Sequence, residues 1–322
     1  MRVVGMASGI EIHAPDDAYF SYFNSPYISH SQGSSIDIYP FHQLWSGEVV
    51  SPVSGKIVKI REMKMGRPKS FPTEDFDFAI GIRPEESPNT IVRVMHCKPG
   101  VNAGESVDKG DSIGTTLRSR YFNYWTGPHY HVEIMDEDSF LRSSKSYPFE
   151  RTIDLGALQE SGLNKQSSDF ELEVSSVTKD FVKVFSKDFT AVTIGHLTGL
   201  AAMDSNGLVQ GILDGGISHY KHGGIVGESG IECGYEVYLG NVPIGRMYDS
   251  NRFLRGPSCV AYLNSQRIKG ISCFVYPGLY SRRGQQPIVL VPQYYGQFRD
   301  TLAEGDIAIL KIAGESNTVK AP

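Results

Sequence analysis

Residues 127–134 read GPHYHVEI, and this stretch decides the fold that we expect. Histidine and bulky apolar residues alternate in it with the period of two that is typical of a β-strand, so His129, His131 and Glu133 should share one face. Because histidine is the commonest metal ligand and the usual general base near neutral pH, two imidazoles side by side predict a metal site with chemistry attached. The same alternation also occurs on exposed polar strands, so the prediction needs support from the rest of the chain.

Four upstream stretches give that support, because they precede the histidines in a recognisable order. They read IDI at 36–38, SGEVVSPVSGKIV at 46–58, VMH at 94–96 and VNAGESVDKGDSIG at 101–114. Together with GPHYHVEI, the ordered set resembles the lysostaphin-type zinc endopeptidases, whose motifs include a His and Asp ligand pair, a Pro-x-x-Gly turn, a Tyr-x-His segment and a closing His-x-His strand. The resemblance runs from about residue 28 to residue 136.

The resemblance implies an all-β fold, in which an antiparallel β-sandwich with hairpins carries the site and a second β-rich domain follows. It implies Zn²⁺ as the cofactor, with Asp37 and His131 as ligands and His129 as the general base. It also implies that His96 stabilises the oxyanion formed during peptide-bond hydrolysis. Glu133, one step further along the same strand face, is expected to anchor the strand or a neighbouring donor group.

The third ligand departs from the family pattern. The family places its first histidine four residues before the aspartate, where this chain has Gly33. The nearest upstream histidine is His30, seven residues before Asp37. We predict that His30 is the ligand, because the small residues between the two positions bend easily and can turn the chain back. The alternatives are that His42 or His96 replaces it, or that the ligand is lost.

Two other classes of function remain open beside a zinc-dependent peptidase. One is a non-catalytic module that uses the same scaffold to bind a peptide or a partner protein. The altered His30 to Asp37 spacing favours this module, and the intact His-x-His pair opposes it. The other class is a carrier domain, because Met63-Lys64-Met65 copies the biotin-carrier tripeptide. Since it lies only twelve residues after Pro52, we interpret Lys64 as an ordinary loop lysine.

Composition limits the partners and the compartment. The 322 residues carry a formal net charge of −5, which gives no electrostatic case for nucleic acid or an anionic membrane. No apolar run approaches the ~20 residues of a membrane-spanning helix, and residues 1–6 lack the features of a signal peptide. The four cysteines are widely separated without a Cys-x-x-Cys pair, which predicts free thiols and a cytoplasmic location. We therefore expect a peptide or protein substrate; the sequence does not indicate an oligomeric state.

The chain is expected to divide near residue 150. We predict a metallopeptidase-like β domain at 1–154, a polar linker at 155–168 and a β-rich domain of unassigned family at 169–322. Strand-like runs in the last part lie at 170–177, 181–185, 190–194, 235–239, 271–276, 288–291 and 307–312. Within it, residues 214–224 (DGGISHYKHGG) bring Asp214, His219 and His222 together. We interpret them as a flexible surface loop with solvated histidines rather than a second zinc site.

Overall fold

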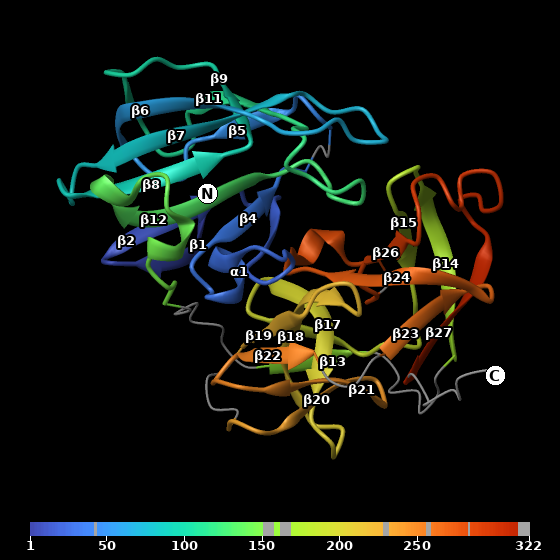
Figure 1. The fold of residues 1–322 in the computed structure, drawn as a ribbon. Coiled ribbons are helices and arrows are strands. Elements are labelled where there is room, and N and C mark those ends of the chain that lie inside the picture. Colours follow the sequence, from blue (N-terminus) through green and yellow to red (C-terminus); the bar gives the residue numbers. More distant parts are fainter. Residues whose placement is uncertain are drawn as a thin grey trace, which may run out of the picture. The chain divides into compact units, whose positions relative to one another are not determined.

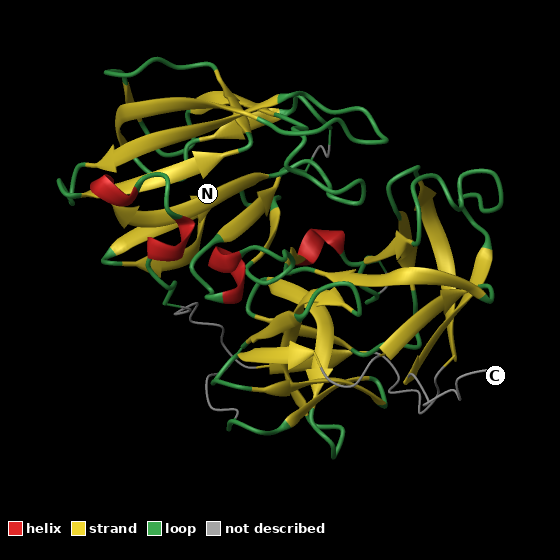
Figure 2. Ribbon diagram, in the orientation of Figure 1, coloured by secondary structure: helices red, strands yellow, loops and turns green. Residues whose placement is uncertain are grey.

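The computed structural model describes residues 1–41, 44–150, 158–161, 169–227, 232–255, 259–282 and 284–314. The described residues are almost entirely strands and turns, with helix α1 (Ile28–Ser31) and three short 3-10 turns (Figure 2). The expected all-β class is therefore confirmed. No helix among these residues is long and apolar enough to cross a membrane.

The chain forms two compact units. The first unit contains Met1–Tyr22 and Tyr27–Asp154, and the second contains Phe23–Pro26 and Leu155–Pro322. Of the linker expected at 155–168, only residues 158–161 are described. They form a strand that pairs with residues 191–194 instead of running as a free connection.

The first unit is built from a two-stranded hairpin, a seven-stranded sheet and a three-stranded sheet, all antiparallel (Figure 1). The order of the large sheet is β10-β6-β7-β8-β12-β4-β3, and that of the small sheet is β5-β11-β9. The strands are β1 (Arg2–Ala7), β2 (Ile10–Ala14), β3 (Tyr19–Ser21), β4 (Ile36–Tyr39), β5 (Glu48–Val50), β6 (Gly55–Lys64), β7 (Phe76–Pro84), β8 (Thr90–Met95), β9 (Cys97–Pro99), β10 (Ser106–Val107), β11 (Ser112–Thr116) and β12 (Tyr130–Asp136).

The register of strand β12 positions the first unit's polar residues. Strand β12 lies between β8 and β4, and every residue but its last is buried. His131 is directly opposite Asp37 on β4 and Met95 on β8. Since facing residues of an antiparallel pair lie within side-chain contact, this register alone brings His131 beside Asp37. Lys64 is the last residue of β6 and pairs with Phe76, so our interpretation of it as a loop lysine is wrong.

The second unit is a larger antiparallel sheet system whose described residues include a large buried apolar cluster. Phe170, Phe253 and Phe298 are among its largest fully buried side chains. Its described strands are β13 (Leu158–Ser161), β14 (Asp169–Val177), β15 (Val182–Phe185), β16 (Ala191–Ile194), β17 (Leu197–Met203), β18 (Val209–Ile217), β19 (His222–Val226), β20 (Glu236–Leu239), β21 (Val242–Met247), β22 (Arg252–Arg255), β23 (Cys259–Leu263), β24 (Gln266–Cys273), β25 (Tyr276–Pro277), β26 (Ile288–Pro292) and β27 (Ile307–Gly314).

Six of the seven strand-like runs predicted in this unit fall on single strands, whereas the run 271–276 spans the end of β24, two residues outside any strand and the start of β25. The interpretation of residues 214–224 is wrong. They belong to the hairpin of β18 and β19, in which Asp214 is 0% exposed and His222 is 8% exposed. Glycine allows this close packing: a Cβ atom at Gly224 would lie 2.1 Å from the ring of Phe23. The glycines that suggested a loop therefore lie in a hairpin, where the absence of side chains permits close packing.

Candidate metal centre

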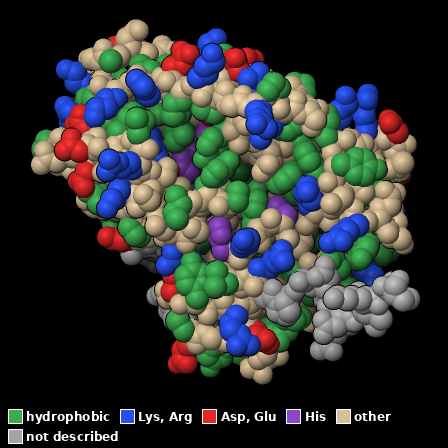
Figure 3. Space-filling view, in the orientation of Figure 1, with side chains coloured by type: hydrophobic (Ala, Val, Ile, Leu, Met, Phe, Trp, Pro, Cys, Tyr) green, Lys and Arg blue, Asp and Glu red, His purple; other side chains and the backbone are tan. Residues whose placement is uncertain are grey.

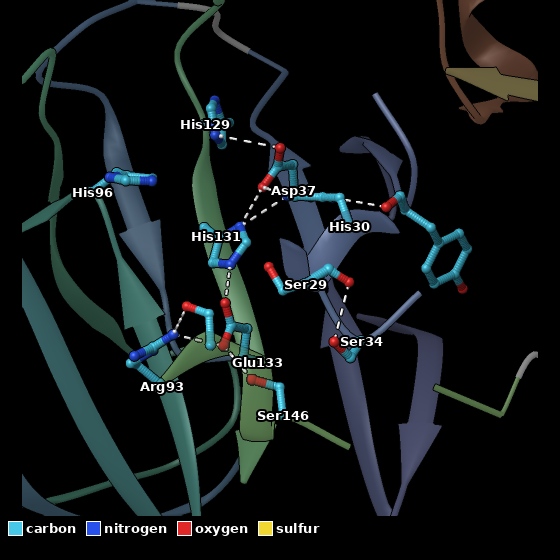
Figure 4. A network of polar contacts seen from close by, with 12 residues as sticks. Ser29, His30, Ser34, Asp37, Arg93, His96, His129, His131, Glu133 and Ser146 are labelled. Atoms are coloured by element: carbon cyan, nitrogen blue, oxygen red, sulfur yellow. Dashed lines mark hydrogen bonds and ion pairs between the residues drawn. The ribbon is translucent and has the colours of Figure 1, made fainter. Parts of the chain in front are cut away.

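Three side chains from two strands and a short helix converge in the first unit (Figure 4). His131 Nδ1 lies 2.7 Å from Asp37 Oδ1, and His30 Nε2 lies 3.3 Å from the same oxygen. The two histidine nitrogens are 3.2 Å apart. Within the described ranges, this trio is the group of His, Cys, Asp or Glu residues whose ligand atoms could hold a metal, all within 4.8 Å of one another.

Helix α1 and the turn after it bring His30 back to Asp37 despite the seven-residue spacing. Gly33 adopts a φ of 66°, in the left-handed region that favours glycine. The turn then closes on Ser34, whose N–H and hydroxyl both donate to the carbonyl of Ser29, at 2.8 and 3.0 Å. Of the alternative ligands, His42 lies outside the described residues, and His96 does not belong to the trio.

Fixed hydrogen bonds orient the two histidines of the trio. His30 Nδ1 lies 2.7 Å from the carbonyl oxygen of Tyr22, which can only accept, so Nδ1 carries a proton and Nε2 faces the centre. His131 Nε2 lies 2.6 Å from the Glu133 carboxylate and donates to it, so Nδ1 faces the centre. One proton on His131 Nδ1 can then be shared by Asp37 and His30. Two nitrogens and one carboxylate oxygen are donors that suit zinc.

Charge compensation accompanies the burial of these groups. Burial alone would lower the pKa of His131, but its hydrogen bonds to Asp37 and Glu133 raise it to about 9. Burial would raise the pKa of Asp37, yet the neighbouring histidines hold it well below its usual range. Glu133 likewise has its pKa lowered to about 2 against the effect of burial, by His131 and Arg93.

Arg93 and Ser146 complete the support behind His131, and the sequence analysis did not find either residue. The Arg93 guanidinium donates to Glu133 Oε2 at 2.6 Å, and the Ser146 hydroxyl donates to the same oxygen. Arg93 is 3% exposed and Glu133 0%. Arg93 is the one charged residue in the strand TIVRVM at 90–95, which is buried throughout. Because a buried charge requires a partner, this arginine in an otherwise uncharged run could have indicated a buried ion pair from the sequence.

His129 lies at the edge of the trio, immediately before β12. Its Nδ1 donates to the carbonyl of Gly127 at 2.9 Å, and its Nε2 lies 3.6 Å from Asp37 Oδ2. Burial lowers the pKa of His129 to about 4, so its ring is neutral near pH 7 and Nε2 carries a lone pair. The arrangement leaves this nitrogen able to accept a proton.

His96 faces the same centre from the opposite side (Figure 4). Its ring centroid lies 5.6 Å from that of His129 and 5.9 Å from that of His131. Its Nδ1 lies 2.7 Å from the carboxylate of Asp77, a residue absent from the sequence-based site. Asp77 is a lone acid in the apolar stretch FDFAIGI at 76–82, which is the pattern that could have drawn attention to it.

Comparison with known proteins places the chain in a family. Residues 12–151 match the family described as "Domain of unknown function (DUF8155) N-terminal domain". Residues 177–283 match the family described as "Domain of unknown function (DUF8155) C-terminal domain". The two matches together cover more than half of the chain, which therefore belongs to this family. No curated protein matches it.

Among solved structures, the chain is similar to two structures of lysostaphin. The antimicrobial peptidase lysostaphin from Staphylococcus simulans aligns at 14% identity and a TM-score of 0.28, over 61% of this chain and 88% of that one. A solution structure of lysostaphin aligns at 16% identity and a TM-score of 0.25, over 59% and 85%. These values are too low to establish a shared fold or activity.

Proposed function

We propose that the chain is a zinc-dependent hydrolase of peptide bonds, with His30, Asp37 and His131 as the metal ligands. The observation that carries the proposal is the convergence of His30 Nε2, Asp37 Oδ1 and His131 Nδ1. Each histidine of the trio has its other ring nitrogen bound to a fixed acceptor, as is usual for metal-ligating imidazoles. Three protein ligands are also the number that a catalytic zinc site keeps, with one position open.

The residues around the trio divide the proton chemistry between them. When bound, zinc would supply the Lewis acidity that activates water and polarises a carbonyl group. His129 accepts the proton of the attacking water at Nε2, because its Nδ1–H is held by the Gly127 carbonyl. The same nitrogen returns this proton to the leaving amine. His96, which faces the centre from the other side, stabilises the developing oxyanion by a hydrogen bond.

The substrate is proposed to be a peptide or protein, not nucleic acid or a membrane surface. On the face drawn in Figure 3, Lys and Arg side chains are scattered rather than gathered into one continuous patch. All four cysteines are free thiols, and three of them are buried. Since free thiols persist in reducing compartments, we propose a cytoplasmic location, which fractionation of the native host would test.

The main alternative is a non-catalytic peptide-binding module, which the unusual spacing of His30 and Asp37 in the sequence favours. The close approach of these two side chains weakens this alternative, because His30 can act as the third ligand and no other histidine has to replace it. The two functions differ in turnover: a module binds peptide without cleaving it.

Peptide cleavage by zinc-loaded protein tests the proposal. A mixture of unrelated peptides is incubated with wild-type protein and with His131→Ala, and new amino termini are detected by mass spectrometry. We expect cleavage by the wild type alone. Equal cleavage by both proteins would assign it to a contaminant, and binding without cleavage would establish the module.

A further inference from the structure

The hydrogen bonds behind His96 form a closed polar network in the first unit. His96 joins β8 to β9 with a φ of 63°, a left-handed conformation that is unfavourable for a residue other than glycine. Its N–H donates to the carbonyl of Phe78 at 3.2 Å, and its carbonyl accepts from the N–H of Leu117 at 2.9 Å. The backbone is thus held on both sides in a conformation that it would not adopt alone.

Asp77 is the partner of the His96 ring. Its carboxylate is 0% exposed and accepts three hydrogen bonds at 2.7 Å, from His96 Nδ1, the Ser119 hydroxyl and the N–H of Phe78. The Ser119 hydroxyl in turn accepts from the N–H of Tyr121 at 3.3 Å, so its own proton is directed to Asp77. Because an ionised carboxylate can only accept, Nδ1 of His96 must carry a proton.

Two aromatic rings fix the plane of His96. Its centroid is 4.5 Å from that of Phe122 and 5.0 Å from that of Tyr121. The ring therefore cannot turn away from the centre without losing both contacts and the Asp77 hydrogen bond. The two histidines differ in the partner of Nδ1, which is a carboxylate for His96 and an uncharged backbone carbonyl for His129.

We infer that Asp77, held by Ser119, is a positioning residue that fixes His96 with Nδ1–H toward the carboxylate and Nε2 toward the reaction centre. The effect of Asp77 on catalysis rests on the proposed function, in which His96 stabilises the oxyanion. Nε2 can donate a hydrogen bond to the oxyanion when the ring carries a second proton, and the Nδ1–H bond to Asp77 is kept in that form. The network thus divides the roles: His129 accepts a proton and His96 donates a hydrogen bond.

Asp77→Asn tests this inference with little change in shape. If the carbonyl oxygen of the introduced amide keeps the Phe78 N–H, the amide nitrogen replaces the oxygen that now faces His96 and donates to Nδ1. Long-range ¹H–¹⁵N spectra of the zinc-loaded protein then report the tautomer of His96 directly. We expect a protonated Nδ1 in the wild type and an unprotonated Nδ1 in Asp77→Asn, with unchanged zinc content. Ser119→Ala is the matched control and should keep the protonated Nδ1, because Asp77 remains.

Turnover separates this inference from the proposed function. In Asp77→Asn we expect kcat for peptide cleavage to fall on the order of 100-fold or more at an unchanged KM. An unprotonated Nδ1 in the wild type, or the same tautomer in both proteins, would overturn the positioning role; the wild-type spectrum decides even if the variant does not fold. A change of tautomer in a protein that cleaves no peptide would leave Asp77's role standing and refute the hydrolase.

Discussion

Zinc binding should compete with a single proton at His131. In the metal-free site the hydrogen bonds to Asp37 and Glu133 raise the pKa of His131 to about 9, so a proton occupies Nδ1 at neutral pH. Zinc must displace that proton to reach the nitrogen, while the proton on Nε2 remains with Glu133. Below pH 9, the apparent Kd should therefore weaken about tenfold for each pH unit, or roughly 100-fold from pH 8 to pH 6.

Calorimetry of the metal-free protein measures this competition. Titrations with zinc at pH 7, in two buffers of different ionisation enthalpy, give the number of protons released, and we expect about one. Competition with a chelator of known pH dependence gives the Kd at each pH. Release of no proton, together with a constant Kd between pH 6 and pH 8, would refute the assignment of His131 Nδ1 as a ligand atom.

The remaining predictions concern the support of the site and of the sheets. His129→Ala should retain zinc by elemental analysis but lose peptide cleavage, since His129 is a base and not a ligand; parallel loss of metal would contradict this. Glu133→Ala should leave Arg93 buried without its ion-pair partner and cost about 3–5 kcal/mol in denaturant unfolding, and an unchanged midpoint would refute that. Gly114→Ala places a Cβ 2.1 Å from the Lys98 carbonyl oxygen at a φ of 155°, so it should destabilise the protein by at least ~2 kcal/mol. Gly66→Ala is the control: it has open space around it and should change stability by less than about 0.5 kcal/mol. The free energy of unfolding of the metal-free protein should fall by on the order of 3 kcal/mol as pH rises from 6.5 through 9, because the pKa of His131 is higher in the folded chain than in the unfolded one. Denaturant unfolding at each pH should show no such fall in His131→Ala.

Features that depend on local periodicity could be predicted from the sequence. The alternation at 127–134 predicted the strand that carries His131, since the period of two is a property of the strand itself. The small residues and glycine between His30 and Asp37 likewise predicted a turn that brings the two side chains together, as they are in the structure. The all-β class followed from the same short, punctuated runs.

Features that depend on pairing between distant segments could not be predicted. Asp77 meets His96 because β7 pairs with β8 in the register that sets Ala79 opposite Met95, and no local pattern specifies that register. The glycines at 215–224 indicated a loop by propensity, but their packing as a hairpin, with Phe23 against Gly224, depends on tertiary contacts.

The metal content of the purified protein tests the central claim most directly. Elemental analysis of wild-type protein, Asp37→Ala and His131→Ala, each dialysed against the same zinc-containing buffer, measures the metal bound per chain. We predict about one zinc per chain in the wild type and essentially none in either variant, because each substitution removes one of three ligands. Full zinc content in both variants, or none in the wild type, would contradict the assignment of the centre to His30, Asp37 and His131.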